Sequence, residues 1–333
     1  IHLNQFQVKR NCRDYPRYFT TQADATHFSG CKGKIISENG FYESMADDAI
    51  NVHGTYLQIQ QQVDSKTVIA SYMHNESYGF DWGEIGDCVR LIRPLNMEYL
   101  PAILEIIQIQ PCDAPTSCGA KQFKITFASP LPELTAGEKY GLENLSWFPS
   151  VEFRHNVVRH NRARGALFST HQKVLCENNL FDHTHGSAIL LCGDCNGWFE
   201  SSACSNVVIR KNRFVNALTA NYQFTEGVIS IYPEIPDLTA QKDYFHRNIE
   251  ITDNEFDIFD AQLLYAKSTK NLHFSNNIIR RNQDFVPFHP NKFMFKFERV
   301  KDVFIENNVF NTLLNSEYAI YATDGTNLKF DNN

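Results

Sequence analysis

Two short stretches near the start of the sequence place carboxylates beside imidazoles and amides. The residues from Asp47 to Gly54 read Asp-Asp-Ala-Ile-Asn-Val-His-Gly, and those from Ala23 to His27 read Ala-Asp-Ala-Thr-His. A hydrophobic core does not favour these side chains, because buried ionised groups are costly unless they are paired. Carboxylates a few ångströms apart cannot all ionise, so one pKa rises and the group contains both an acid and a base. The candidate catalytic residues are Asp24, Asp47 and Asp48.

A second polar segment, from Asn161 to Ser205, holds the other candidate site residues. Planar polar groups bind sugar hydroxyls, and a flat aromatic ring covers the C–H groups of a sugar. Asn51, His53 and His27 of the acidic stretches are added to them. The predicted substrate-binding residues are then Arg162, Arg164, His53, Asn51, His27, Asp194, Trp198, Glu200 and His185. Two of these have an equally simple structural interpretation, because Trp198 can anchor its loop on the core and His185 can be an ordinary histidine of the scaffold.

The elements that must position these residues follow from a repeat of the form apolar-x-apolar-x-x-Asn. Its copies are Phe6 to Asn11, a weaker one from Ile36 to Asn39, and those ending at Asn156, Asn179, Asn212, Asn254, Asn277, Asn308 and Asn333. Short segments that alternate with period two indicate strands, and a period in the low twenties is typical of a solenoid. We predict an all-β, right-handed parallel β-helix. The recurring Asn suits a turn between strands and can form a hydrogen-bonded ladder along the coils.

The repeat also predicts how the acidic residues align. Asp47 and Asp48 follow Asn39 by eight and nine residues, and Asp24 follows Asn11 by thirteen. If five residues bulge out at 12–17, Asp24 lies one coil below Asp47, about 4.8 Å away. Counted in the same way, Arg162 and Arg164 stack on the next coil above the acids.

Residues 59–148 interrupt the repeat. They contain strand-like segments separated by Gly, Pro and Asp turns, including Thr67 to Ala70 and Phe123 to Phe127, and they predict a small antiparallel β-barrel or sandwich. The predicted organisation is residues 1–58 as N-terminal coils, 59–148 as the inserted domain, and 149–333 as C-terminal coils. The insertion is either a wall of the site or a structural and oligomer contact, so a homo-oligomer is one prediction. A further excursion at 216–247 is predicted to rim a pocket.

Composition excludes several classes of function. The net charge is −7 and no basic run is present, which argues against nucleic acid as a partner. The sequence contains no stretch of 18 apolar residues, so no membrane span is predicted. The CxxC from Cys192 to Cys195 stands alone, and a single pair is weak support for zinc, so no metal and no cofactor are predicted. Because the sequence opens and closes within the repeat, we expect it to be part of a longer protein.

Together the acidic stretches, the Asn-Arg-Ala-Arg-Gly segment from Asn161 and the Gly-Asp-x-Asn-x-Trp-Phe-Glu-Ser-x-Ala-Cys loop from Gly193 resemble glycoside hydrolase family 110. The resemblance runs from about Ala23 to Phe214. Members of that family are exo-acting α-1,3-galactosidases, some acting on the blood-group B antigen, with a parallel β-helix and inserted β-barrel domains. The resemblance implies hydrolysis with inversion, without metal, using the aspartates at positions 24, 47 and 48, and a galactose-terminated glycan as substrate.

Glycoside cleavage requires a protonated carboxyl for the leaving oxygen and an ionised carboxylate, which clustered aspartates supply. Asp47 or Asp48 is expected to be the acid, and Asp24 belongs to the pair that holds water. Two other classes remain open at this point: a β-helix polysaccharide lyase, which the two arginines beside acids would suit, and a non-catalytic carbohydrate-binding β-helix. From the substrate, we expect a secreted or periplasmic location.

Overall fold

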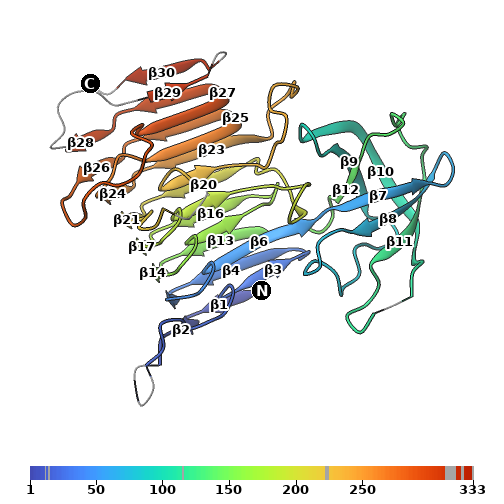
Figure 1. Ribbon diagram of the computed structural model, residues 1–333, viewed down its shortest axis with the longest axis horizontal. Coiled ribbons are helices and arrows are strands. Elements are labelled where there is room, and N and C mark those ends of the chain that lie inside the picture. Colours follow the sequence, from blue (N-terminus) through green and yellow to red (C-terminus); the bar gives the residue numbers. More distant parts are fainter. Residues whose placement is uncertain are drawn as a thin grey trace.

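The computed structural model describes residues 1–11, 13, 16–114, 116–221, 225–311, 320–323 and 326–331. Every regular element in these ranges is a β-strand. Most of them form a solenoid of stacked coils, and a separate barrel lies beside its lower coils, as Figure 1 shows. No described segment forms a helix long and apolar enough to cross a membrane. The predicted all-β fold, a parallel solenoid with an inserted barrel, is confirmed.

Three rows of parallel strands form the solenoid. The first row comprises β1 (His2–Asn4), β4 (Lys34–Glu38), β13 (Ser150–Arg154), β16 (Val174–Glu177), β20 (Val207–Arg210) and β23 (His246–Thr252). The second row comprises β3 (His27–Ser29), β6 (Ile50–Thr55), β15 (Ala166–Phe168), β18 (Ile189–Leu191) and β22 (Ile229–Ile231). Two long strands, β25 (Leu264–Ser275) and β27 (Phe295–Glu306), continue both rows, and β27 pairs with β29 (Ile320–Ala322) and β30 (Leu328–Asp331).

The third row is a separate eight-stranded sheet. It comprises β2 (Gln7–Val8), β5 (Phe41–Glu43), β14 (Val157–Arg159), β17 (Leu180–Asp182), β21 (Arg213–Val215), β24 (Glu255–Ile258), β26 (Ile278–Arg281) and β28 (Val309–Asn311). Alternate residues of all three rows point inward, where phenylalanines stack from coil to coil. The rings of Phe181 and Phe214 lie 5.3 Å apart, and those of Phe214 and Phe256 lie 4.7 Å apart. This stacking accounts for much of the high phenylalanine content.

An asparagine ladder joins the first row to the third. The backbone N–H of each ladder residue donates to the side-chain oxygen of the next, from Asn156 to Asn179 (2.9 Å) and onward through Asn212, Asn254, Asn277 and Asn308. These residues are buried, so the ladder satisfies backbone groups that water does not reach. The predicted ladder is present over these positions, and its last predicted member, Asn333, lies outside the described residues.

The two N-terminal copies of the repeat were assigned to the wrong register. Gly40, not Asn39, occupies the ladder position, because Val157 pairs with Phe41 and the Gly40 N–H donates to Asn156 Oδ1 at 2.8 Å. One coil lower, Gln7 pairs with Phe41, so Phe6 and not Asn11 takes that position. The chain has no side-chain amide at these two places, and the nearest asparagine in the sequence was therefore misleading.

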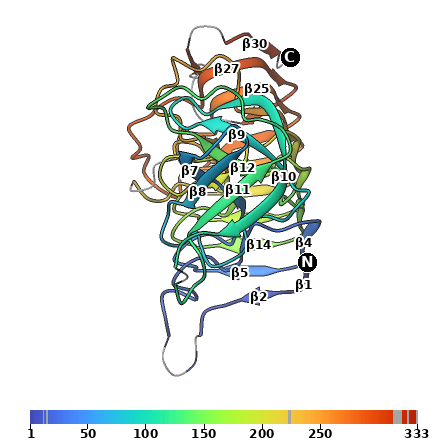
Figure 2. The same cartoon turned by 90° about the vertical axis from the view of Figure 1, so that its right-hand side faces the viewer.

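The inserted domain is a closed six-stranded barrel. Its strands are β7 (Leu57–Gln62), β8 (Thr67–Tyr72), β9 (Cys88–Arg93), β10 (Glu98–Pro111), β11 (Gln122–Phe127) and β12 (Gly141–Asn144). The chain passes from β6 into β7 with one residue between them, and it returns from β12 to β13 of the solenoid. Figure 2 views the molecule from the barrel side and shows the solenoid coils behind it.

Candidate active site

The acidic residues lie in the turns that lead from the third row into the second row. Asp24 precedes β3, and Asp47 and Asp48 lie between β5 and β6. His27 pairs with Asn51, so Asp24 lies directly below Asp48. The repeat, counted from the wrong residues, had placed it below Asp47. The backbone confirms this register, because the N–H of Ala25 donates to the carbonyl of Asp48 at 2.9 Å.

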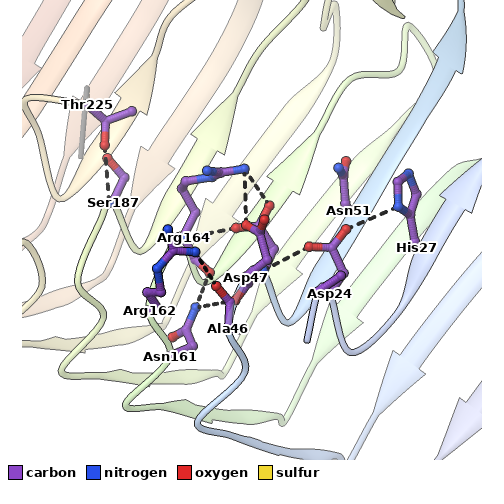
Figure 3. Close-up of polar contacts among 12 residues, drawn as sticks. Asp24, His27, Ala46, Asp47, Asn51, Asn161, Arg162, Arg164, Ser187 and Thr225 are labelled. Carbon is purple, nitrogen blue, oxygen red and sulfur yellow. Dashed lines mark hydrogen bonds and ion pairs between the residues drawn. The ribbon is translucent and has the colours of Figure 1, made fainter. Parts of the chain in front are cut away.

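The three carboxyl groups converge. One oxygen of each of Asp24, Asp47 and Asp48 lies within 4.8 Å of the others. The backbone N–H of Asp48 donates to Asp24 Oδ1 at 2.9 Å, and Figure 3 shows the group flanked by His27 on one side and Arg164 on the other. The predicted clustering of these three residues on one face is therefore present. Their side chains come from two adjacent coils.

Arg164 stacks on the acids from the coil above. Its Nη2 lies 2.9 Å from Asp48 Oδ2 and 3.6 Å from Asp47 Oδ1, and its backbone N–H donates to Asp48 Oδ1 at 2.9 Å. The guanidinium is largely buried, so it requires nearby negative charge. Those carboxylates raise the pKa of Arg164 despite its burial, and it is a cation at any physiological pH.

Asp47 and Asp48 differ in environment although they are adjacent. The Asp47 side chain is 40% exposed, whereas that of Asp48 is fully buried. Burial raises the pKa of Asp47; Arg164 opposes this shift and Asp24 adds to it. Burial raises the pKa of Asp48 further, with the same opposition from Arg164 and additions from Asp24 and Asp47. Three carboxyls with one close arginine therefore favour a protonated member, and Asp47 is the one that faces solvent.

Two histidines and a glutamate continue the polar surface beyond Asp24. His27 Nδ1 lies 3.2 Å from Asp24 Oδ2, and this hydrogen bond raises the pKa of His27, against the effect of burial. Its Nε2 lies 2.6 Å from His53 Nε2, and His53 Nε2 lies 3.5 Å from Glu200 Oε1. The Asn51 amide donates to the same oxygen at 3.4 Å. Glu200 belongs to β19 (Glu200–Ser201), which pairs antiparallel with β6.

Two groups could hold a metal ion by distance alone within the described part of the chain. They are the three aspartates, and His27 with His53 and Glu200. Asp47 and Asp48 already share Arg164, and the two imidazoles contact each other directly. Proton transfer by paired carboxyls needs no metal ion at either group. That the protein works without a metal stays a prediction.

The tryptophan loop is held by Asp194. Its carboxylate accepts hydrogen bonds from the backbone N–H groups of Asn196 (2.6 Å), Gly197 (3.0 Å) and Trp198 (2.6 Å). Trp198 is 56% exposed, and its ring lies 4.3 Å from that of His74 in the barrel. Asp194 thus shapes a loop that presents an indole from the solenoid to the barrel, and the tryptophan is not buried in the core.

A cavity of about 670 Å³ extends from the acids across this face. Its size is within the ~300–1,000 Å³ typical of small-molecule sites. The predicted site residues that line it are Asp24, His27, Asp47, Asn51, Arg164, Asp194, Trp198 and Glu200. The barrel contributes Glu76 to the wall. Paired carboxyls at one end of a mixed polar and aromatic cavity can transfer protons to and from a bound sugar.

The sequence relatives are proteins named for one activity. The chain is 57% identical over 316 residues to "Alpha-1,3-galactosidase B" of Phocaeicola vulgatus, an alignment that covers 93% of this chain and 52% of that protein. It is 54% identical over 312 residues to the protein of the same name from Parabacteroides distasonis, covering 93% and 51%. The chain is a homologue of the α-1,3-galactosidases. The resemblance inferred from its motifs is confirmed.

The chain spans about half the length of these curated relatives. No protein-family model matches it. A solved structure entitled "Glycoside hydrolase" covers 94% of the chain, and the alignment covers 88% of that structure, at 8% identity and a TM-score of 0.30. That score is too low for a detailed comparison of folds.

Four of the predicted site residues do not line the cavity. Asp48 and His53 are buried behind it, where they contact residues that do line it. Arg162 lies outside, because its guanidinium donates to the carbonyl of Ala46 at 3.0 Å. His185 belongs to the coil above Arg162, and its pKa is lowered by burial and by that arginine. Neither Arg162 nor His185 lines the cavity, and their assignment to the substrate site stays a prediction.

Several lining residues were not predicted individually. They include Glu76 of the barrel, Leu167 and Leu190 on the floor, and Tyr232, Glu234 and Lys267 at the far end. The excursion at 216–247 was expected to rim a pocket, and Tyr232 and Glu234 belong to it. Lys267 gave no signal, because it lies on a strand whose sequence looks like scaffold.

Proposed function

We propose that the protein hydrolyses terminal α-1,3-linked galactose from oligosaccharides or glycoconjugates. The observation that carries this proposal is the group of three carboxyls at one end of an open cavity. The relatives named α-1,3-galactosidases support the same reaction and linkage. The three carboxyls together supply both a proton donor and a base, which are the two requirements for glycoside hydrolysis.

Asp47 is proposed as the general acid. It lines the cavity, and burial raises its pKa, so it retains a proton at a pH where an exposed aspartate would have lost it. Asp24 also lines the cavity and accepts hydrogen bonds from the Asp48 backbone and from His27. A carboxylate held by two donors is suited to activate water. Asp48, buried behind both, is proposed to act through its contacts with Asp24 and Arg164 and to position both groups.

The configuration of the released galactose distinguishes an inverting from a retaining mechanism. The family resemblance supports inversion. The nearest oxygens of the three aspartates lie within 4.8 Å. This spacing is closer to the ~5–5.5 Å between the carboxyl groups of retaining enzymes than to the ~6.5–9.5 Å of inverting ones. We propose inversion, with water held by Asp24, and the anomer released first decides between the two outcomes.

Arg164 favours a hydrolase over a lyase. A lyase uses a cation to neutralise a uronate, whereas Arg164 is paired with Asp48 and Asp47. The groups around the acids that remain suited to sugar hydroxyls are Asn51, Glu200 and His27. We also propose a secreted or periplasmic location, since galactose-terminated glycans of this kind are found outside the cytoplasm.

The test follows the anomeric protons by NMR while the protein acts on galactose-α-1,3-galactose, with and without chelator. Early β-galactose that is unaffected by chelator would support inversion without metal. Early α-galactose would overturn inversion and assign a nucleophile to one aspartate. If no galactose is released from this disaccharide or from longer glycans with the same end, the proposed hydrolysis is wrong. An unsaturated product that absorbs in the ultraviolet would favour the lyase.

A further inference from the structure

Lys267 projects into the end of the cavity that lies farthest from the acids. It belongs to β25, and the whole residue is only 8% exposed although it lines the cavity. The strand pairing places Lys267 one coil above Tyr232, because Ile231 pairs with Ala266. Its Nζ lies 4.6 Å from the centre of the Tyr232 ring. A cation this deep in a protein is unusual unless something satisfies it.

No hydrogen bond or ion pair within 4.0 Å satisfies the Lys267 ammonium among the residues that the structure describes. Burial lowers its pKa, and the more distant carboxylates of Glu234 and Glu298 oppose that effect. Glu298 is already engaged, since it accepts a hydrogen bond from the Tyr265 hydroxyl at 2.7 Å and pairs with Lys296 at 3.3 Å. An ammonium has three donors, and leaving them unused in a buried place is costly.

The distance between this end and the acids is set by the sheet. The strand order in the second row runs β6, β15, β18, β22 and β25. Four strand spacings of about 4.8 Å separate β6 from β25, or about 19 Å in all. If a pyranose ring spans about one such spacing, a glycan of about three or four units reaches from the acids to Lys267. The floor between the two ends includes Leu167 and Leu190, which suit the C–H faces of sugars.

The charge around Lys267 indicates which sugars fit. Its surroundings hold the carboxylates of Glu234, Glu298 and Glu226 and the ammonium of Lys296. With Lys267 included, three negative charges face two positive ones, so an acidic sugar would meet net negative charge. A neutral sugar instead finds donors on Lys267, an acceptor on Glu234 and a ring on Tyr232.

We propose that Lys267, Tyr232 and Glu234 form a distal subsite that binds a neutral sugar two or three units beyond the terminal galactose. This inference rests on the proposed function for the identity of the terminal sugar. The subsite would bind the part of the glycan that remains after hydrolysis. It would make the protein select longer glycans without contributing to the chemical step.

The kinetic test compares di-, tri- and tetrasaccharides that share one α-1,3-galactosyl end. For the unaltered protein, kcat/KM is expected to rise about tenfold with length, mainly through KM, as one or two well-placed hydrogen bonds provide. Lys267→Met should remove that rise and leave the disaccharide unchanged. Lys270→Met is the matched control, because Lys270 lies exposed on the same strand. Equal effects of Lys267→Met on all lengths, or no dependence on length, would overturn the subsite.

A binding test separates failure of the subsite from failure of the proposed reaction. The probe is the neutral trisaccharide that lacks the terminal galactose, which cannot be cleaved at that linkage. Calorimetry should show binding to the unaltered protein and to Lys270→Met, with at least fivefold weaker binding to Lys267→Met. Equal affinity in all three proteins, or no binding to any, would contradict the subsite whether or not galactose is released. Lys267→Arg keeps the charge and should retain most of the affinity, which guards against a general folding defect.

Discussion

Asp47 and Asp48 show how far two identical neighbouring residues can diverge. The turn before β6 directs Asp47 into the cavity and Asp48 beneath it, so one side chain is 40% exposed and the other is fully buried. Arg164 contacts both, but more closely Asp48. A proton on Asp47 can reach a bound substrate, whereas Asp48 can act only through Asp24 and Arg164.

Asp47→Asn is expected to reduce kcat on natural glycans by about 10³-fold, within the range typical of general acid catalysis. The fold should be retained, since asparagine has the same shape. With α-galactosyl fluoride the loss should be much smaller, because fluoride leaves with little protonation. Steady-state kinetics on both substrates measure this, with the exposed Asp243→Asn as control. An equal loss on both substrates would show that Asp47 is not the acid.

Arg164 is expected to set the alkaline limb of the pH profile. An acid acts only while protonated, so kcat/KM falls as pH rises through the pKa of Asp47. The positive charge of Arg164 lowers that pKa, against the larger effect of burial. Arg164→Met should therefore move the alkaline limb to higher pH, in addition to lowering activity. Arg210 lies two coils above Arg164 and pairs with Glu177 of the neighbouring strand, so the profile of Arg210→Met should match that of the unaltered protein. A limb that stays in place or moves to lower pH would contradict the assignment.

At the scale of elements, the turns carry the chemistry and the ladder keeps the turns in register. Each ladder asparagine bonds to the coils on both sides of it. Asn212 Oδ1 accepts from the backbone and the side chain of Asn179, and its amide donates to Cys176 and to Asn254. The ladder residues therefore act as a set, and loss of one leaves partners on two coils unsatisfied.

Asn212→Ala is expected to lower the free energy of unfolding by about 4 kcal/mol, because four hydrogen bonds at about 1 kcal/mol each disappear in a buried place. Urea denaturation followed by circular dichroism measures the change. Asn206→Ala is the control, since Asn206 is exposed and contributes its backbone carbonyl to the coil. A loss below about 0.5 kcal/mol, the ordinary range for surface substitutions, would mean that the ladder is dispensable.

The repeat shows why some elements could be predicted from the sequence and others could not. From Asn156 onward the ladder residue and the inward apolar residues recur together, so strand and turn positions follow directly. Gly40 and Phe6 break the pattern, because backbone hydrogen bonds hold the coil without an asparagine there. The resulting shift of one residue misplaced Asp24 against Asp47, although the clustering itself was correct.

Long-range packing limited what could be inferred about the site. Asp24, Asp47 and Arg164 follow from stacking of consecutive turns, which a repeat period predicts. The burial of Lys267 depends on contact with Tyr232 in the previous coil and on loops that close the cavity, which no local pattern encodes. Arg162 was included because counting along the repeat placed it with Arg164 above the acids, but its guanidinium donates to the Ala46 carbonyl.

At the scale of the whole molecule, the barrel and the solenoid share a buried cluster. Tyr56, Ile92 and Met97 come from the barrel or its entry, and they pack with a set from the solenoid loops: Cys195, Phe199, Ala203, Ile235 and Phe245. The ring of Phe245 stacks on Tyr99 with centroids 5.8 Å apart. This cluster fixes the barrel against the loop that carries Trp198, so the two parts of the cavity wall hold one relative position.

Phe245→Ala should cost about 3–5 kcal/mol, as for other large-to-small changes of buried aromatics. It should also separate the unfolding of the barrel from that of the solenoid. Differential scanning calorimetry is expected to show one transition for the unaltered protein and two for the variant. Phe304→Ala, which removes from β27 a ring stacked on His273 of β25, should keep a single transition. A variant with one transition and normal stability would show that the two parts are joined elsewhere.

The closed barrel can be exchanged as one module, because of where its two ends lie. Its entry and exit strands are neighbours, because Leu57 of β7 pairs with Leu142 of β12. The chain therefore leaves the solenoid and re-enters it at almost the same point, and another module with the same apolar contact surface could replace this one without changing the strand pairing of the coils. Genetic exchange of this one module would alter the part of the cavity wall that includes Glu76 and preserve the aspartates, which offers a route to differently shaped cavities on an unchanged scaffold.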